Sequence, residues 1–393
     1  MKNLCILKLE SIRLLDCPAM IIVIKIGTSS ICDPVNFEPR ISSLSRLVET
    51  VVHLQRMGHK VLLVSSGAVG TGMVRLGLRK KPKTVAHTQA VAAVGQGRLM
   101  NLYDSLFQYF NVPIAQILLT RDNLAERIQY LNACSTLREL LGIDVVPIIN
   151  ENDSVSSSEI RFGDNDSLAA ITAGMINANY LFVLTDVDCV YTDNPHTNPD
   201  ATPIRSVSDL ASLKSTIKFK QQGSALGTGG MVTKLIAAEL ATSVGCSMII
   251  TLGSEPQRIP QILECITSGK ELTFGTLFEA KPFRMDDRHW WILHGLAIHG
   301  TLVIDEGAES AITSTSKSSL FAAGIRSISG SFNASQCVAI NSQATGATIA
   351  RGIVNYSSGD ISRIMGCKSS DINQILGYCE SEYVVHRGNI ALV

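Results

Sequence analysis

The alternation of short apolar runs with longer stretches of helical spacing constrains the fold of this chain more than any other feature. Residues 21–26 are apolar and mostly β-branched, and only Lys25 interrupts them, which is typical of a strand buried on both faces. Residues 41–57 then carry apolar side chains at helical spacing, and Gly58 separates them from the next apolar run at 61–64. This unit predicts an α/β fold with a mostly parallel sheet between layers of helices.

The same alternation continues to about residue 268, and the pattern then changes. We expect further helices at 87–110, 124–141 and 231–244, and strands at 114–119, 145–149, 180–184 and 248–252. Beyond residue 268, Gly-rich turns separate short β-type runs at 297–304, 325–329, 338–340 and 347–354, with a Ser/Thr-rich loop expected at 311–320 and a helix at 361–365. The change predicts a second, small domain that resembles a β-barrel.

These patterns divide the chain into four parts. We expect an extension outside the core at 1–19, a main domain at 20–277, a linker at 278–288 and the second domain at 289–393. Every candidate site residue precedes Arg284. We therefore expect a cut near Arg284 to leave the main domain folded and active.

Composition excludes several classes of protein. The 34 basic residues balance 34 acidic ones, so no global field attracts nucleic acid or an anionic membrane. Residues 289–393 hold six Lys or Arg against seven Asp or Glu, which is not the basic footprint that RNA binding needs. No uninterrupted apolar segment predicts a signal peptide or a membrane span. The ten cysteines show no Cys-x-x-Cys spacing, which favours reduced thiols and a cytoplasmic location.

Two polar clusters stand beside predicted strands and helices of the main domain. An Asn-Glu-Asn-Asp run at 150–153 follows the strand at 145–149, and a Gly-Asp-Asn-Asp run at 163–166 precedes an apolar, helical stretch. Open α/β sheets bind ligands at the carboxyl ends of their strands. Single residues of these types also make turns and helix caps, but together they indicate one polar crevice.

Two lysines and a Gly-rich turn point to phosphate chemistry. Lys25 lies in an apolar strand, so its charge must reach a cleft, a partner or the surface. Lys234 ends a Gly-Thr-Gly-Gly-Met-Val-Thr-Lys run at 227–234 before a helix, where backbone N–H groups can hold phosphate. The run is not a Walker A loop, and the first strand lacks the Gly-x-Gly-x-x-Gly of a dinucleotide-binding fold. Phosphoryl transfer with acids that hold magnesium is the favoured chemistry.

Seven segments together resemble the glutamate 5-kinases, a group within the amino-acid kinase family that carries a C-terminal PUA domain. They are 23–29, 65–68, 119–121, 149–153, 163–166, 184–186 and 226–234. The lysine–glycine strand and the Gly-rich loop are shared across the larger family, whereas the paired Asn/Asp runs are more specific to the glutamate enzymes. The resemblance extends from about residue 21 to the end of the chain.

The resemblance implies a role for each matching residue. Lys25, Lys234 and Asp166 match catalytic residues, with Asp166 also the magnesium ligand. Ser66, Asp153 and Asn165 match the positions that bind glutamate. The nucleotide-binding positions are Lys25, Thr185, Asp186, Thr228, Gly229, Gly230, Met231, Val232, Thr233 and Lys234.

The implied activity is ATP- and Mg²⁺-dependent phosphorylation of L-glutamate to L-glutamyl 5-phosphate, the first step of proline synthesis. The resemblance also implies L-proline as a feedback inhibitor, a downstream glutamyl-phosphate reductase and a homo-oligomer. Two alternatives stay open from the residues alone: a kinase of the same fold that acts on aspartate or a small phosphorylated acceptor, and an RNA-binding protein that acts through its second domain.

Overall fold

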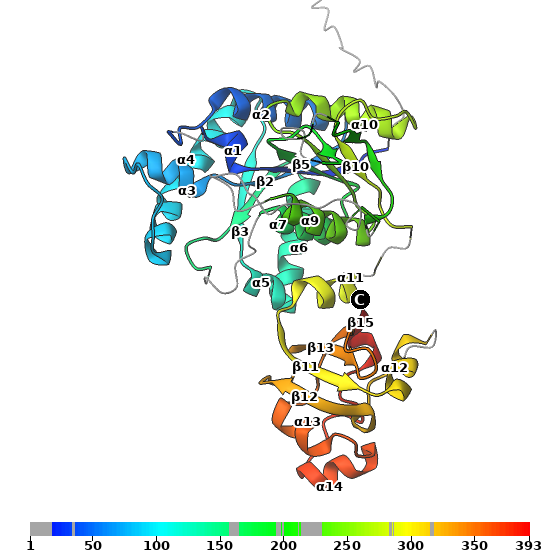
Figure 1. Ribbon diagram of the computed structural model, residues 1–393. Helices are drawn as coiled ribbons and strands as arrows, with labels where there is room; N and C mark the ends of the chain where they lie inside the picture. Colours follow the sequence, from blue (N-terminus) through cyan, green and yellow to red (C-terminus); the bar gives the residue numbers. More distant parts are fainter. Residues whose placement is uncertain are drawn as a thin grey trace, which may run out of the picture.

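The computed structural model describes residues 18–33, 36–156, 165–193, 198, 200–210, 212–213, 230–282, 285, 287–314 and 318–393. The chain forms a larger part around an eight-stranded sheet and a smaller part around a five-stranded sheet, which Figure 1 shows one above the other. The predicted α/β fold with a small β-rich second domain is confirmed. No helix in the described ranges has both the length and the apolar character to cross a membrane.

The large sheet is mostly parallel. Its order is β3 (Ile114–Leu119), β4 (Val146–Glu151), β2 (Lys60–Ser65), β1 (Ile21–Ile26), β5 (Tyr180–Thr185), β9 (Ser247–Leu252), β10 (Thr276–Phe278) and β8 (Ser206–Val207). Only the β9–β10 pair is antiparallel among these neighbours. β6 (Val190–Tyr191) and β7 (Pro203–Ile204) form a separate two-stranded sheet, and Thr276 of β10 is hydrogen-bonded to both strands. Because the central strands are buried on both faces, their sequences are continuous apolar runs instead of alternating ones.

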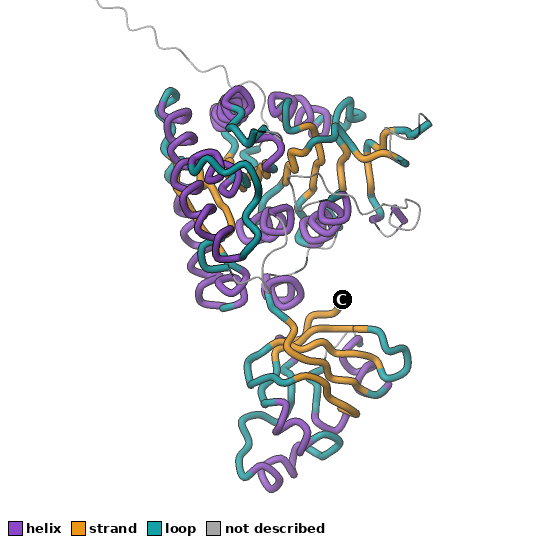
Figure 2. Tube along the Cα trace, turned by 60° about the vertical axis from the view of Figure 1, so that its left-hand side comes forward, coloured by secondary structure: helices purple, strands orange, loops and turns teal. Residues whose placement is uncertain are grey.

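Helices cover both faces of this sheet, as Figure 2 shows. One apolar core packs α2 (Ile41–Arg56), α4 (Val85–Gln108) and α10 (Ile259–Thr267) on the sheet, and the other packs α6 (Arg127–Gly142), α7 (Asn165–Ile176) and α9 (Met231–Ser243). The short α1 (Thr28–Ile31) and α3 (Ala68–Arg75) follow β1 and β2 directly. The strands at 21–26 and 114–119 were predicted with the bounds that the structure has, and the other predicted strands of this sheet differ by one or two residues at an end.

The helix expected at 124–141 is two helices. α5 (Arg121–Ala125) begins at a capping box in which the Thr120 hydroxyl accepts from Asn123 N–H and the Asn123 side chain accepts from Thr120 N–H. α6 then begins anew, because the Glu126 carboxylate caps it by accepting from Gln129 N–H. Helical spacing continues across the break, so the apolar pattern alone predicted one element.

The smaller part is built on the sheet β12 (Ile325–Gly330), β11 (Ile298–Ile304), β13 (Cys337–Ser342), β14 (Thr348–Ile353) and β15 (Ile390–Leu392). α13 (Ser358–Ile364) and α14 (Ile372–Leu376) pack in its own apolar core. The first residues of the loop expected at 311–320 belong instead to α12 (Glu306–Thr313), because Asp305 caps a helix that begins before the Ser/Thr-rich stretch.

A short helical segment joins the two parts. It consists of α11 (Asp287–Trp290) and a π-helix (Trp291–Gly295). Trp290 and Trp291 are buried in the core of the larger part, where Trp291 Nε1 donates to Leu124 O at 2.7 Å. On the other side, the Arg351 guanidinium of β14 donates to Leu293 O. The segment therefore contacts both parts and is not an exposed linker; we call it the wedged segment.

Candidate active site

Carboxyl ends of neighbouring strands meet at one edge of the large sheet, and the predicted site residues lie along it. Ile26, the last residue of β1, pairs with Ser65 of β2 and Leu184 of β5. Lys25 directly precedes that end, and Thr185 is the last residue of β5. This is the edge at which open α/β sheets bind ligands.

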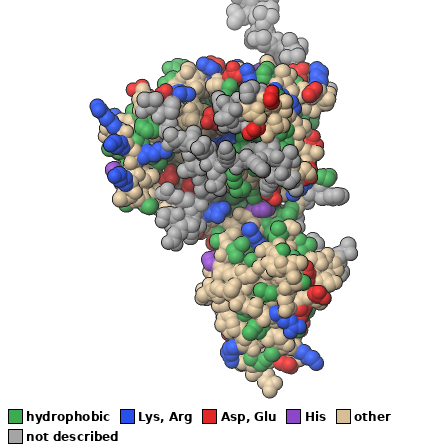
Figure 3. Space-filling view, viewed as in Figure 1, with side chains coloured by type: hydrophobic (Ala, Val, Ile, Leu, Met, Phe, Trp, Pro, Cys, Tyr) green, Lys and Arg blue, Asp and Glu red, His purple; other side chains and the backbone are tan. Residues whose placement is uncertain are grey.

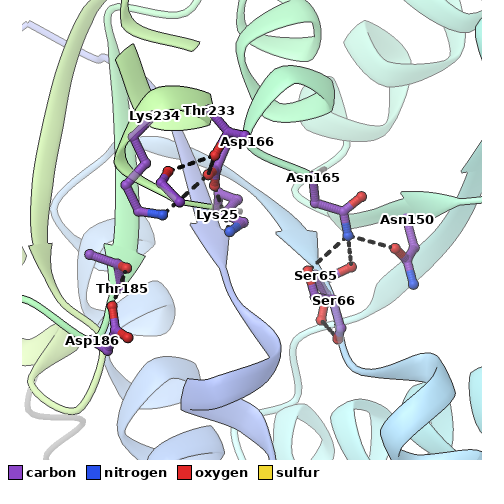
Figure 4. A network of polar contacts seen from close by, with 11 residues as sticks. Lys25, Ser65, Ser66, Asn150, Asn165, Asp166, Thr185, Asp186, Thr233 and Lys234 are labelled. Carbon is purple, nitrogen blue, oxygen red and sulfur yellow. Dashed lines mark hydrogen bonds and ion pairs between the residues drawn. The ribbon is translucent and has the colours of Figure 1, made fainter. Parts of the chain in front are cut away.

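Asp166 lies between two buried lysines and forms an ion pair with each (Figure 4). Lys25 Nζ is 2.6 Å from Asp166 Oδ1, and Lys234 Nζ is 3.3 Å from Asp166 Oδ2. The residue exposures are 0% for Asp166, 7% for Lys25 and 6% for Lys234, so neither lysine extends to solvent. The three charges leave one net positive charge in a buried place, which suits an anionic ligand.

The three members of this charge cluster come from separate elements. Lys25 is near the end of β1, Asp166 is in the first turn of α7, and Lys234 is in the first turn of α9. A carboxylate is favoured near a helix amino terminus and an ammonium group is not. Asp166 therefore suits its own helix and also offsets the unfavourable position of Lys234.

Two opposing effects act on the pKa of Asp166. Burial raises the pKa, but the charges of Lys25 and Lys234, together with hydrogen bonds from Lys25 and Thr233, outweigh burial and hold the pKa below its ordinary value. The carboxylate therefore stays ionised throughout the neutral range and keeps both lysines oriented.

The start of α9 is tied to this cluster through Thr233. Thr233 Oγ1 is 3.1 Å from Asp166 Oδ2 and 2.8 Å from Gly230 O, so its single hydrogen is shared between two acceptors. Gly230 caps α9, and Met231 and Val232 form its first turn with Thr233 and Lys234. The predicted nucleotide residues Thr228 and Gly229 lie outside the described residues.

A neutral amide network occupies the neighbouring part of the edge. Asn165, which begins α7 beside Asp166, donates through Nδ2 to Ser65 O at 3.1 Å, to Ser66 Oγ at 2.9 Å and to Asn150 Oδ1 at 3.0 Å (Figure 4). The network thus joins the ends of β2 and β4 to the start of α7. Asn165 and Ser66, both predicted to bind glutamate, are in direct contact.

Asp153 lies farther along the same crevice. It follows β4 in a turn and lines a cavity of about 300 Å³ between α4, β3 and β4, together with Gln96, Gln116 and Glu151. Among the described residues, Asp153 makes no hydrogen bond to Ser66 or to Asn165. The third predicted glutamate residue is thus near the amide network but not part of it.

Thr185 and Asp186 form a third group at the end of β5. Thr185 is buried and donates through Oγ1 to Asp186 Oδ1 at 3.0 Å, whereas Asp186 is exposed. Figure 4 shows the pair on the side of the lysines that faces away from Asn165. This arrangement separates Thr185 and Asp186 from Asn165 and Ser66, with the charge cluster between them.

The space-filling view shows the same part of the molecule from outside. In Figure 3, basic and acidic side chains are interspersed over the surface of the larger part that faces the viewer. The two buried lysines of the charge cluster are 7% and 6% exposed. Their charge is therefore available to a ligand within the site and not to the general surface.

Sequence reasoning missed two residues of the site, Asn150 and Ser65. Asn150 lies within the Asn-Glu-Asn-Asp run, and its side chain accepts a hydrogen bond from Asn165. Ser65 contributes its backbone carbonyl to Asn165 and its hydroxyl to Tyr103. Their positions at strand ends, directly beside predicted site residues, were the available signal.

Profiles of two protein families match this chain. The profile of the amino acid kinase family matches residues 20–251, and that of the PUA domain matches residues 300–376. A probable glutamate 5-kinase of Schizosaccharomyces pombe is 53% identical over 93% of this chain and 92% of its own length. A glutamate 5-kinase of Acaryochloris marina is 48% identical over 94% of this chain and 98% of its own length.

Among solved structures, a carbamate kinase from Giardia lamblia bound to AMP-PNP superposes with a TM-score of 0.47 and 17% identity, over 67% of this chain and 99% of its own. A likeness of this size does not bear on the substrate. The family match and the identities over nearly the full length carry the assignment: the chain belongs to the amino acid kinase family and, within it, to the glutamate 5-kinases.

Proposed function

We propose that this chain transfers the γ-phosphoryl group of ATP to the side-chain carboxylate of L-glutamate and forms L-glutamyl 5-phosphate, the first step of proline synthesis. The observation that carries the proposal is the ion triplet of Lys25, Asp166 and Lys234 beside the amide network of Asn165. One group suits a transferring phosphoryl, and the other suits an amino acid. The names of the two glutamate 5-kinases that match nearly the full chain support the same substrate.

The reaction needs no general base. A glutamate side chain in an unstructured peptide has a pKa of about 4.3, so its carboxylate is already an anionic nucleophile at neutral pH. The difficulty is repulsion between that carboxylate and the phosphates of ATP. Lys25 and Lys234 offset this repulsion and stabilise the charge that spreads over the phosphoryl oxygens during transfer. Asp166 is the positioning group that keeps both lysines in place.

At the glutamate end, Ser66, Asp153 and Asn165 bind the amino acid in this proposal. The carboxylate of Asp153 pairs with the α-ammonium group, which explains an acid in a site that otherwise needs positive charge. At the nucleotide end, Lys25, Thr185, Asp186 and the segment 228–234 contact ATP. The charge cluster lies between the two groups, as in-line transfer requires.

Magnesium fits this site as an ion that arrives with ATP. In the ranges that the structure describes, no group of three His, Cys, Asp or Glu side chains could hold a metal by itself. Mg²⁺ commonly takes only one or two protein carboxylates and fills its remaining positions with phosphate oxygens and water. Asp166 is the proposed protein ligand, and the bound ion would supply further charge neutralisation on the phosphates.

L-Proline is the proposed feedback inhibitor. It keeps an amino-acid ammonium and carboxylate but lacks the side-chain carboxylate, so it can occupy the groups around Asp153 and Asn165 without accepting phosphate. Initial rates at low glutamate should fall with added L-proline and recover as glutamate is raised, whereas D-proline should have little effect. Rates unchanged at millimolar L-proline would exclude this regulation and leave the kinase assignment intact.

Three further expectations belong to the same proposal. The product is a labile acyl phosphate, so a glutamyl-phosphate reductase should consume it directly. The protein is expected to act in the cytoplasm and to form a homo-oligomer.

The test of the proposed function is trapping of the product. Purified protein with MgATP and hydroxylamine should form hydroxamate from L-glutamate much faster than from L-aspartate, and ADP release should depend on glutamate. An equal or reversed preference would refute the glutamate assignment and favour another acceptor on the same fold.

A further inference from the structure

One face of α4 presents three polar side chains to the glutamate end of the site. Gln89, Gln96 and Tyr103 are spaced by seven residues, which brings them onto the same side of a helix. We call them the α4 polar face. Gln89 Nε2 donates to Ser156 O at 3.0 Å, Asn150 Nδ2 donates to Gln96 Oε1 at 3.0 Å, and the Tyr103 hydroxyl is 2.9 Å from Ser65 Oγ. Each side chain therefore holds a different segment of the site.

A close contact between helices brings this face within reach of the strand ends. Gly95, which precedes Gln96, lies against the backbone of α3, and a Cβ at this position would be 1.8 Å from Ala68 O. Tyr103 is fully buried, so α4 cannot slide without disturbing the core. The helix is therefore fixed at the distance at which its polar side chains make hydrogen bonds to the loops.

Gln96 supports the orientation that the Asn150 amide takes. The backbone N–H of Glu151 donates to Asn150 at 2.9 Å, and because an N–H can only donate, the atom that it meets is Oδ1. Asn150 Nδ2 then points to the opposite side, where Gln96 accepts it. Without that acceptor, the buried NH₂ group would lose its partner on α4, and the Asn150 side chain would be held less firmly against Asn165.

The orientation of Asn150 is passed on to Asn165. Asn150 Oδ1 and the backbone carbonyl of Ser65 are both acceptors, so the Asn165 atom that contacts them is Nδ2. Oδ1 of Asn165 is left on the other side of its amide. Within the described part of the chain, no donor contacts that oxygen.

This orientation of the Asn165 amide matches the hydrogen-bonding groups of L-glutamate. At neutral pH the α-ammonium group is the substrate's hydrogen-bond donor, and its two carboxylates only accept. Asn165 Oδ1 can accept from the ammonium group. Ser66 Oγ already accepts from Asn165 Nδ2 at 2.9 Å, so its own hydrogen remains for a carboxylate oxygen. An inverted Asn165 amide would reverse both preferences.

We propose that the α4 polar face supports the recognition of glutamate. Gln96 and Tyr103 are positioning residues that hold Asn165 and Ser66 in the one arrangement of hydrogen-bond donors and acceptors that suits an amino acid. Gln96 acts through Asn150, and Tyr103 acts through Ser65. The inference rests on the proposed function and deepens it, because it assigns substrate affinity to a helix that carries none of the predicted site residues.

The test is Gln96→Met, which keeps the length of the side chain and removes its acceptor. We expect the KM for glutamate to rise about tenfold, as for the loss of one buried hydrogen bond, with kcat and the KM for ATP changed less than about twofold. Gln108→Met is the matched control, because Gln108 is an exposed glutamine at the end of the same helix. It should leave all three constants unchanged.

A double-mutant cycle separates positioning from direct contact. If Gln96 acts through Asn165, Gln96→Met should have no further effect on glutamate affinity, measured by calorimetry, in an Asn165→Ala background. The same effect in both backgrounds would overturn the proposal, because Gln96 would then act independently of Asn165. An unchanged KM in folded Gln96→Met would also overturn it.

Tyr103→Phe provides a second route if Gln96→Met does not fold. It removes one hydroxyl and keeps the buried ring, and we expect a selective rise in the KM for glutamate of about threefold to tenfold. Equal changes in the KM values for glutamate and ATP would indicate a general structural role and contradict the proposal. A wild-type protein without glutamate-dependent ADP release would refute the proposed function itself, so the two failures are distinguishable.

Discussion

The phosphoryl end and the glutamate end of the site are held together by different forces. Lys25, Asp166 and Lys234 hold one another by charge, and each group is buried. Asn165, Ser66 and Asn150 hold one another by neutral hydrogen bonds, and their orientation depends on α4. Coulomb attraction depends mainly on distance, whereas hydrogen bonds also require direction. The glutamate end is therefore the part that needs support from outside the site.

α7 is the element that both ends share. Its first two residues are Asn165 and Asp166, one in each group. Trp290 packs on the same helix farther along, where a Cβ at Gly174 would be 3.2 Å from its ring. Loss of support for α7 should therefore impair phosphoryl transfer and glutamate binding together. A change at one end of the site should impair mainly the function of that end.

The largest expected effect comes from a chain that ends at Arg284. The cut removes Trp290 and Trp291, which are 1% and 5% exposed in the core of the larger part. Truncation of one buried Trp typically costs about 3–5 kcal/mol, and a whole domain is stable by only about 5–15 kcal/mol. We expect a loss of cooperative thermal unfolding and of activity. This differs from the sequence-based expectation of an active truncated kinase.

A chain that ends at Leu296 is the matched comparison, because it keeps the buried tryptophans and removes the second domain. It should unfold at a clearly higher temperature than the chain that ends at Arg284. Similar, near-wild-type unfolding of both chains would mean that the wedged segment does not stabilise α7.

At the phosphoryl end, Lys25→Ala and Lys234→Ala should each lower kcat by about 10²–10³, with smaller changes in the KM for glutamate. The physical reason is that each ammonium group stabilises charge that develops mainly in the transition state. Steady-state rates over both substrates measure the effect. Lys60→Ala is the control, since Lys60 pairs with Asp144 at the exposed opposite end of β2. Near-normal turnover in a folded Lys25→Ala or Lys234→Ala protein would remove that lysine from the catalytic group.

At the glutamate end, Asp153→Asn should chiefly raise the KM for glutamate, by about tenfold to a hundredfold. An ammonium–carboxylate contact is similar in the ground state and the transition state, so its loss affects binding more than turnover. The KM for ATP should stay constant in the same assay. A defect confined to kcat would contradict the role of Asp153 in substrate binding.

The pH dependence of stability should show the smallest effect. The folded-state pKa of Asp166 lies below its ordinary value of 3.8, so its ion pairs stabilise the fold above that pH. This contribution is lost as the pH falls from 3.8 through the folded-state pKa. The difference in unfolding free energy between wild type and Asp166→Asn should therefore shrink on acidification. A difference that stays constant as the solution is acidified to about pH 2 would contradict the ion-pair assignment.

The sequence predicted the phosphoryl end better than the glutamate end. Lys25 is conspicuous because a charge interrupts an apolar strand, and Asp166 and Lys234 stand at predicted helix starts. We expected these three side chains to lie close together because the carboxyl ends of parallel strands meet at one edge of a sheet, and because the family resemblance assigns all three to one site. The roles of Gln96 and Tyr103 could not be predicted in this way, because polar residues at seven-residue spacing also occur on solvated helix faces. That this face lies toward the site depends on tertiary packing, such as the close contact of Gly95 with α3.

The segment that joins the two parts was also beyond sequence reasoning. Glycine-rich turns and short β-type runs predicted the second domain, but nothing in the local pattern indicated that Trp290 and Trp291 belong to the core of the first. Burial of a tryptophan depends on the surface that receives it. Here that surface includes Gly174 of α7 and the Leu124 carbonyl of α5, which are distant in sequence.

The central claim is that the charge cluster serves phosphoryl transfer and the amide network serves glutamate binding. The most direct measurement is calorimetric titration of L-glutamate into Lys234→Ala, beside wild type and Asp153→Asn. The account predicts that Lys234→Ala binds glutamate within about threefold of wild type, although it turns over about 10²–10³ more slowly, and that Asp153→Asn binds it much more weakly. Loss of glutamate affinity in Lys234→Ala to the level of Asp153→Asn would contradict the division.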